Sequence, residues 1–293
     1  MISILITSWK EPKTLEKAIC ALLPQMNEDD EMLVACPDEE TANIVSLYSN
    51  NNRVVKCIRD EGRGKPAALN LLFKEARGDV LVLSDGDVYV GDNAVSELVK
   101  PFSDPRVGAV SGHPISAEER DTMFGFWSHL LTDTAHSIRM ERNAKEEIIV
   151  CSGYLYAIRN GLIDTVPEDA LSEDAVISHM MWAKGFKTKY AEKSEVYVKY
   201  PTTFKDWLKQ KKRSAGGYTQ IKGYVGETPM MRSFGKESSG IFGVMAYPKN
   251  FKERIWTFKL ILARLLLWGL IFVDMKIKKK GLNELWERVE STK

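Results

Sequence analysis

The sequence predicts an α/β fold in which helices flank a mostly parallel, Rossmann-like sheet, with amphipathic helices at the C-terminal end. Strand and helix patterns alternate at short spacing over residues 1–115, which is typical of a parallel sheet with helices on both faces. An apolar run at residues 80–84 indicates a buried central strand. Residues 255–275 are rich in Leu, Ile, Trp and Phe and indicate a C-terminal helix of different character.

The individual elements follow from the spacing of apolar residues between turn signals. Strands are predicted at residues 2–7, 31–36, 53–58, 80–84, 107–112, 148–158 and 195–200. Helices are predicted at residues 12–23, 39–49, 66–76, 93–102, 122–143, 172–184 and 203–212. We therefore expect an α/β domain over residues 1–220 and a C-terminal amphipathic helical region, at a membrane interface, over residues 221–293.

Composition sets broad limits on the function. The 293 residues carry 41 basic and 40 acidic side chains, and the net charge of +1 argues against nucleic acid as a partner. The cysteines have no C-x-x-C spacing, which indicates reduced core thiols rather than a zinc or redox motif. The sequence opens with a strand pattern and shows no secretory signal pattern, so a cytoplasmic location is expected.

Two carboxylates, Asp85 and Asp87, follow the apolar run at residues 80–84 with one glycine between them. Ligands of an α/β sheet bind beyond the carboxyl ends of its strands, where both side chains emerge. Neighbouring carboxylates repel unless a cation or a proton lies between them, and Mg²⁺ or Mn²⁺ with phosphate oxygens as further ligands suits such a pair. The alternative is a solvated Asp-Gly-Asp turn without a ligand.

Two further segments lie where a nucleotide diphosphate would need them. Thr7, Ser8 and Glu11 stand between the first strand and the first helix, and their hydroxyl and carboxylate groups suit a base or ribose, although Ser and Thr are also ordinary helix N-caps. A glycine-containing loop places Asp60 and Lys65 just before a helix, whose free N–H groups and dipole favour phosphate. A plain loop at a helix start explains these residues equally well.

The second half of the α/β region supplies an acidic pair and a basic helix end. Glu173 and Asp174 open the helix predicted at residues 172–184, where the helix dipole favours an ionised carboxylate that can accept a proton. Acidic residues in a first turn also complement the dipole without any function. Gln210 and Arg213 lie at a basic helix end that we expect to run into a flexible, glycine-containing loop, where they contact either a diphosphate or solvent.

In this order, the segments resemble glycosyltransferase family 2, whose members are inverting enzymes of the GT-A fold. The resemblance covers roughly residues 1–220 and is closest to the processive, cellulose-synthase-like branch. It rests on Asp85-Gly86-Asp87, Asp60 with Gly64-Lys65 and Ala68-Leu69-Asn70, residues 101–112, Ser172-Glu173-Asp174, and Gln210-x-x-Arg213.

The resemblance implies roles for the individual residues. Asp174 would be the catalytic base with Glu173 beside it. Asp87 would bind Mn²⁺ or Mg²⁺, and Asp85 would face the metal or the ribose. Ser214 stands where the processive branch has tryptophan, so polymerising activity is not implied. The remaining nucleotide-sugar-binding positions would be Thr7, Ser8, Glu11, Asp60, Lys65, Gln210 and Arg213.

The activity implied by the resemblance is metal-dependent, inverting hexosyl transfer. An acceptor hydroxyl or phosphate would attack the anomeric carbon of a UDP- or GDP-linked sugar, on the face opposite the diphosphate. Two alternatives stay open. One is a phosphatase of the haloacid dehalogenase type, with Asp85 as nucleophile, and the other is a catalytically silent, membrane-associated adaptor that binds a nucleotide sugar.

The C-terminal stretch suggests where the acceptor comes from. Its uncharged run extends only from Leu265 to Val273, shorter than the ~20 apolar residues that a membrane span needs. An amphipathic helix in the membrane interface fits better, with the lysines at residues 276–280 near anionic headgroups. We therefore expect residues 255–280 to hold the protein on the cytoplasmic face of a membrane, with a lipid-linked or glycan acceptor. The alternatives are a helix packed on the protein's own core and a truncated or tilted transmembrane segment.

Overall fold

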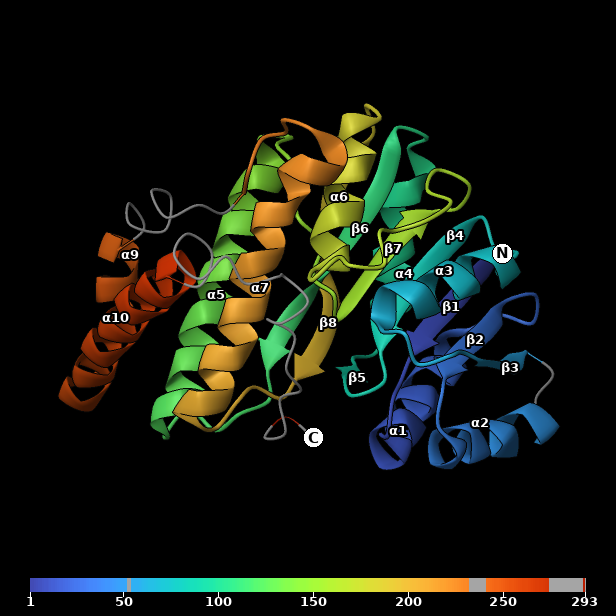
Figure 1. Cartoon of the computed structure of the whole chain (residues 1–293), viewed down its shortest axis with the longest axis horizontal. Helices are drawn as coiled ribbons and strands as arrows, with labels where there is room; N and C mark the ends of the chain where they lie inside the picture. Colours follow the sequence, from blue (N-terminus) through green and yellow to red (C-terminus); the bar gives the residue numbers. More distant parts are fainter. Residues whose placement is uncertain (52–53, 232–240, 274–291, 293) are drawn as a thin grey trace.

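A mixed eight-stranded sheet forms the centre of the computed structural model, which describes residues 1–51, 54–231, 241–273 and 292 (Figure 1). The strand order is β3-β2-β1-β4-β7-β6-β8-β5. Because β7 runs antiparallel to β4 and β6, and β5 to β8, the other six strands share one direction, and the mostly parallel sheet is confirmed. The strands are β1 (Ile2–Thr7), β2 (Glu31–Cys36), β3 (Val55–Arg59), β4 (Val80–Asp85), β5 (Tyr89–Val90), β6 (Val107–Ser116), β7 (Leu155–Arg159) and β8 (Lys187–Val198).

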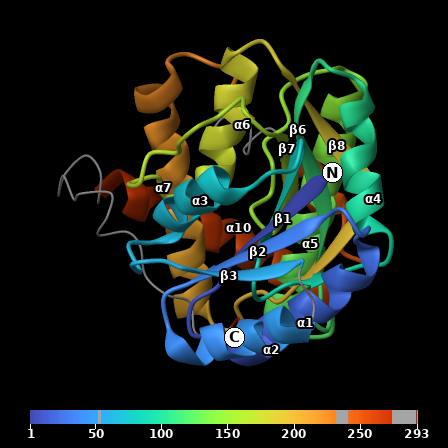
Figure 2. The same ribbon diagram turned by 90° about the vertical axis from the view of Figure 1, so that its right-hand side faces the viewer.

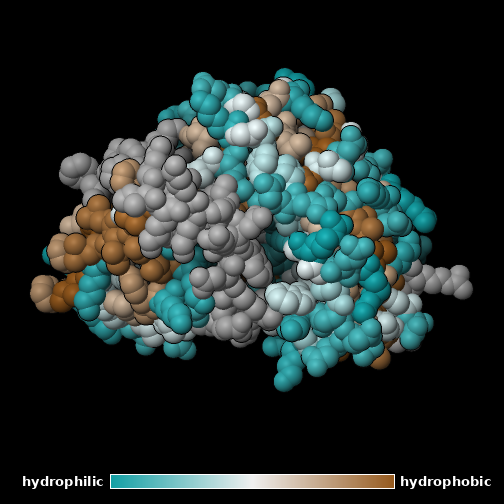
Figure 3. All heavy atoms as spheres, in the orientation of Figure 1, coloured by the Kyte–Doolittle hydropathy of each residue, from teal (hydrophilic) through white to brown (hydrophobic). Residues whose placement is uncertain are grey.

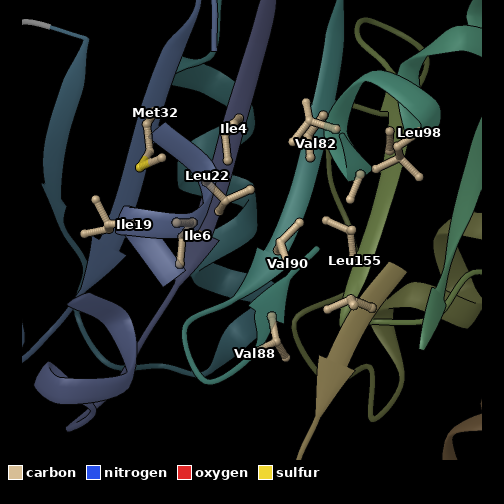
Figure 4. Packing of buried hydrophobic residues seen from close by; sticks show 14 of the residues in the cluster. Ile4, Ile6, Ile19, Leu22, Met32, Val82, Val88, Val90, Leu98 and Leu155 are labelled. Atoms are coloured by element: carbon tan, nitrogen blue, oxygen red, sulfur yellow. The ribbon is translucent and has the colours of Figure 1, made fainter. Parts of the chain in front are cut away.

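Helices cover both faces of the sheet (Figure 2). Side chains alternate along each strand, so in β1 Ile4 and Ile6 enter one core with α1, α2 and α4, whereas Leu5 enters a second core with α3 and α6. Figure 4 shows part of the first core. The helices are α1 (Pro12–Leu22), η1 (Leu23–Gln25), α2 (Glu39–Asn51), α3 (Lys65–Glu75), α4 (Ala94–Val99), η2 (Lys100–Ser103), α5 (Met123–Ala144), α6 (Glu173–Ala183), α7 (Phe204–Val225), α9 (Ile241–Ala246) and α10 (Phe251–Phe272).

Two predicted strands differ from the observed ones. The strand predicted at residues 148–158 is wrong over its first part, because the backbone amides of Ile149 and Cys151 donate to the side-chain hydroxyls of Thr188 and Ser178 instead of to backbone carbonyls of a neighbouring strand. The ladder therefore begins only at the start of β7. In contrast, β8 begins well before the predicted residue 195. The two-residue β5 is too short to give a sequence signal.

The glycines that suggested a flexible loop lie inside α7, so that prediction is wrong. A Cβ atom on Gly217 would lie only 2.3 Å from Ser172 Oγ. The missing side chain thus lets α7 pass close to the residue that precedes α6. Gln210 and Arg213 therefore lie on one continuous helix that packs against α6, rather than next to a loose loop.

Helix α10 packs against α5 and α7 in a third apolar core. It begins at Phe251, before the predicted residue 255, because Asn250 caps it by accepting a hydrogen bond of 2.9 Å from Glu253 N. Residues 274–280, with the predicted lysine cluster, lie outside the described residues. The domain division at residue 220 stays a prediction.

Candidate active site

A cavity of about 980 Å³ lies beyond the carboxyl ends of β1 and β4. Its wall continues onto α5, α7 and α10. The cavity brings together every residue that the sequence proposed for the site: Thr7, Ser8, Glu11, Asp60, Lys65, Asp85, Asp87, Glu173, Asp174, Gln210 and Arg213.

The Asp-Gly-Asp segment packs tightly against the end of β1. Thr7 pairs with Asp85 in the sheet register, and Gly86 N donates to Thr7 O at 3.2 Å. A Cβ atom on Gly86 would lie 2.7 Å from Ser8 Oγ, so only glycine fits between the two aspartates. The Ser8 hydroxyl is buried and has no hydrogen-bond partner in the described parts of the chain. It is therefore placed to bond a ligand group such as a ribose hydroxyl.

Lys65 joins the two acidic parts of the site. Its Nζ lies 2.6 Å from Asp85 Oδ1 and 2.6 Å from Glu173 Oε1. Burial disfavours the charged Lys65, but the two carboxylates outweigh it and raise its pKa. Burial likewise opposes ionisation of Glu173, yet the Lys65 ammonium holds the pKa of Glu173 below its usual value. Lys65 is therefore a fixed cation in the cavity.

Asp87 is a carboxyl group that would gain from a nearby cation. Burial and the charge of Asp85 raise its pKa to about 6, against the opposing effect of Lys65 and Arg213. A divalent ion would relieve this repulsion, and carboxylate oxygens suit Mg²⁺ or Mn²⁺. Asp87 and Asp85 thus fit a metal ion. No cluster of three or more His, Cys, Asp or Glu side chains suited to a metal occurs among the described residues, so phosphate oxygens and water would complete the ligand set.

Asp174 lies in the first turn of α6, and two backbone amides orient its carboxylate. Oδ2 accepts a hydrogen bond from Gly153 N, and Oδ1 accepts one from Ala175 N, both at 2.8 Å. Burial and the neighbouring Glu173 nevertheless raise the pKa of Asp174 to about 6, although the start of the helix favours the ionised form. A pKa just below neutrality suits a general base.

The other walls hold the remaining predicted side chains. The positive charge of Arg213 on α7 favours the ionised forms of both Asp87 and Glu173. It partly offsets the raised pKa of Asp87 and helps to keep the pKa of Glu173 low. Gln210, one turn earlier, donates from Nε2 to Tyr154 Oη at 3.4 Å. Asp60 accepts a hydrogen bond of 2.7 Å from Gly62 N, and burial raises its pKa.

Two tyrosines near the site, Tyr154 just before β7 and Tyr156 within it, escaped the sequence analysis. Tyr154 lines the cavity, while Tyr156 is fully buried and its hydroxyl has no hydrogen-bond partner within the described segments. Burial, then the charges of Glu173 and Asp174, raise the pKa of Tyr156 well above its ordinary value. The position of Tyr156 follows from the pairing of β7 with β4, which local sequence patterns do not predict.

A family model described as "Glycosyltransferase like family 2" matches residues 1–217 of the chain. The chain is also similar to the poly-beta-1,6-N-acetyl-D-glucosamine synthase of Staphylococcus aureus (strain COL). Their identity is 23% over 226 residues, which cover 75% of this chain and 55% of that protein. The chain spans about half the length of the curated relatives it matches.

Two solved structures share the fold. The mannosyltransferase PcManGT from Pyrobaculum calidifontis, in complex with GDP-Man and Mn²⁺, has a TM-score of 0.61 and 16% identity, covering 97% of this chain and 82% of that chain. The glucosyl-3-phosphoglycerate synthase from Mycobacterium tuberculosis, in complex with Mn²⁺ and UDP-glucose, has a TM-score of 0.55 and 13% identity, covering 78% of this chain and 80% of that chain. At these identities the likeness concerns the fold alone, and that fold is GT-A.

Proposed function

This chain belongs to glycosyltransferase family 2, and from that premise we propose that it is an inverting, metal-dependent glycosyltransferase. The donor is a UDP- or GDP-linked sugar, and the acceptor is a hydroxyl or phosphate of a lipid-linked molecule or a glycan. One observation carries the proposal: a buried base candidate, Asp174, shares a cavity with Asp85, Asp87 and the cation Lys65. Such a site can hold a nucleotide diphosphate and remove a proton beside it.

The proposed reaction is a single displacement at the anomeric carbon. Asp174 accepts the proton of the acceptor hydroxyl while the acceptor oxygen bonds to that carbon. The bond between the carbon and the diphosphate oxygen breaks, and attack from the opposite face inverts the configuration. A general base of this kind contributes ~10²–10⁴ in rate.

The leaving diphosphate needs positive charge. Lys65 and Arg213 supply it, and the loss of one such contact costs about 3–4 kcal/mol in comparable sites. When bound, Mn²⁺ or Mg²⁺, held by Asp87 with Asp85, would neutralise further negative charge on the diphosphate. The proposed contacts to the nucleotide are Thr7, Ser8, Glu11 and Asp60.

We also propose that the protein is peripheral on the cytoplasmic face of a membrane and that α10 makes the contact. This helix of 22 residues has a mean hydropathy of 1.8 over its most apolar window, of which 28% is buried. It is the one candidate membrane span among the described residues, by length and composition. Because one face packs against α5 and α7, we favour a helix that lies on the membrane over one that crosses it.

The experiment that tests the donor site is thermal unfolding with UDP, GDP and other nucleotides, with and without Mn²⁺. A ligand at ~100 times its Kd should stabilise the protein by about 2.7 kcal/mol. We expect one nucleotide to raise the melting temperature only when Mn²⁺ is present, and we expect Asp87→Ala to abolish this increase. The absence of any shift would contradict the proposal. Binding without turnover of any donor would instead favour the adaptor, and phosphate release from simple phosphate esters would favour the phosphatase.

A further inference from the structure

The cavity has two chemically different walls. The strand ends and α6 contribute carboxylates, as described above. The opposite wall, from α5 and α10, is apolar apart from two arginines, Arg139 and Arg264, and two threonines. Its apolar members include Leu130, Ile138, Leu260, Ile261, Leu265 and Trp268. Apolar side chains and arginines on one wall suit a ligand that has both an apolar part and an anionic group.

Helix α10 presents a second apolar face, away from the body of the protein. Leu260 and Leu267 are buried against α5 and α7. Figure 3 shows apolar residues gathered on the side of the molecule where α9 and α10 lie. The exposed large apolar residues of α10, most of them three or four positions apart, are Phe251, Ile255, Phe258, Leu262, Leu265, Leu266 and Phe272.

Leu265 belongs to both surfaces. Its side chain lines the cavity, and the residue is 56% exposed on the outward face. Arg264 and Trp268, its neighbours on α10, also line the cavity. The outward apolar face is therefore continuous with the apolar wall of the candidate active site.

The position of α10 is fixed by polar contacts at its N-terminal end. Arg120 binds both carboxylate oxygens of Glu253 at 3.3 Å and donates to Tyr247 Oη at 2.7 Å. Trp127 Nε1 donates to the backbone oxygen of Trp256 at 2.8 Å. A helix held in this way keeps a constant relation between the outward face and the cavity.

Resting on the proposed function, we propose that the acceptor is a lipid bearing a phosphate or diphosphate headgroup, which enters from the bilayer beside α10. Its apolar chain lies over Leu265 and Trp268 along the α5–α10 wall. Arg264 and Arg139 contact the anionic headgroup. On a diphosphate-linked sugar the attacking group is a sugar hydroxyl, whose proton passes to Asp174, and on a monophosphate it is an ionised phosphate oxygen, which has no proton to lose. The proposal rests on two observations: the two apolar surfaces are continuous, and the charged side chains on this wall are both positive.

The test compares transfer of labelled sugar to three probes: polyprenyl phosphate, a polyprenyl-diphosphate-linked sugar and a soluble oligosaccharide. The lipids are presented in vesicles of phosphatidylcholine with phosphatidylglycerol, and again in detergent micelles. We expect a lipid probe to be used. Arg264→Gln and Leu265→Glu should each raise its KM at least about tenfold, or ~1.4 kcal/mol, with Arg264→Lys recovering part of the loss.

Leu266→Glu is the matched control, because Leu266 is 49% exposed on the outward face but does not line the cavity. It should weaken vesicle binding while leaving the KM in micelles unchanged. Preferential use of the soluble oligosaccharide, with Arg264→Gln and Leu265→Glu unaffected, would overturn the inference. So would a dimer that Leu266→Glu converts to a monomer, since a second copy would then cover this face. The metal-dependent rise in melting temperature with nucleotide separates the two proposals. If the lipid predictions fail but this rise persists in the variants, the donor site stands and only the proposed lipid route is contradicted.

Discussion

The ammonium of Lys65, at the start of α3, lies 2.6 Å from the carboxylate of Asp85, at the end of β4. The same ammonium lies 2.6 Å from Glu173 on α6. One cation thereby links the strand that carries the metal-binding candidates to the helix that carries the base candidate. Because these side chains are largely shielded from water, their attraction is screened much less than that of a surface pair.

Replacing this cation should damage both folding and turnover. In Lys65→Met, Asp85 and Glu173 lose their partner. Because the side chains of Lys65 and Asp85 are 28% and 24% exposed, the loss of unfolding free energy should lie between the ~0–1 kcal/mol of a surface pair and the ~3–5 kcal/mol of a fully buried one. With the diphosphate contact also lost, kcat/KM should fall ~10²–10³, and Lys65→Arg should recover part of it. Denaturant unfolding and steady-state transfer assays measure the two effects.

Lys145→Met is the control for charge removal, since Lys145 and Glu141 form an exposed pair with 57% and 64% of their side chains accessible. Exposed pairs contribute about 0–1 kcal/mol, so this variant should behave as the wild type. A Lys65→Met protein with wild-type kcat/KM would remove Lys65 from the site.

A side chain at Gly86 should disturb the metal segment through Ser8. The new Cβ in Gly86→Ala would meet Ser8 Oγ at 2.7 Å and Ser8 Cβ at 2.8 Å. Overpacking of this kind costs about 1–3 kcal/mol of unfolding free energy. The rise in melting temperature that a nucleotide produces with Mn²⁺ should also become smaller. The double variant Ser8→Gly/Gly86→Ala removes both colliding atoms, so it should recover stability relative to Gly86→Ala. An unchanged melting temperature and nucleotide shift in Gly86→Ala would show that the packing is looser than described.

The rate of transfer should follow the ionisation of Asp174. Its pKa is raised to about 6 by burial and Glu173, and only the deprotonated form accepts a proton. We expect kcat/KM to rise with pH through about 6 and to level off above it, because kcat/KM reports the ionisation of the free enzyme. A flat kcat/KM profile from pH 5 to 8 would contradict the assignment of Asp174 as base.

Protein stability should change with pH in the opposite direction. The folded-state pKa of Asp174 lies above the unfolded value of ~3.9, so folding favours the protonated form. This contribution is fully present below about pH 4 and is lost as the pH rises through about 6. The difference in unfolding free energy between Asp174→Asn and the wild type should therefore move in favour of the variant as the pH is raised from 4 to 7.

Weakening the attachment of α10 to the rest of the protein should reduce transfer to the acceptor without changing the binding of the donor nucleotide. Arg120→Ala leaves the carboxylate of Glu253, which is 7% exposed, without its cation. We expect the unfolding free energy to fall by about 1–3 kcal/mol and proteolysis near α10 to become faster. Transfer to the acceptor should decrease, while the rise in melting temperature with nucleotide should stay unchanged. Limited proteolysis and thermal unfolding of the same samples test this. A stable variant with full transfer would show that the attachment of α10 is dispensable.

The sequence predicts well which of these residues lie together at the strand ends, for a physical reason. The carboxyl ends of parallel strands meet at one edge of a sheet, so Thr7 and Asp85 had to lie close together once their strands were identified. The helix start after Lys65 and the first turn of α6 were likewise found from local signals.

The rest depends on contacts between distant segments. The bridge from Lys65 to Glu173 requires α3 and α6 to lie on the same face of the sheet, which local patterns leave open. Gly217 lowers local helix propensity, and its role becomes visible only where α7 meets Ser172. Arg264 and Leu265 join the site because α10 folds back on α5, a contact that apolar spacing alone does not specify.

The most direct test of the account is transfer by Asp174→Asn, compared with the wild type and with Asp169→Asn, a change at another carboxylate of the same cavity. We predict that Asp174→Asn loses ~10²–10⁴ of the transfer rate while the metal-dependent nucleotide shift persists, and that Asp169→Asn retains activity. Transfer by Asp174→Asn at the wild-type rate would contradict the proposed mechanism.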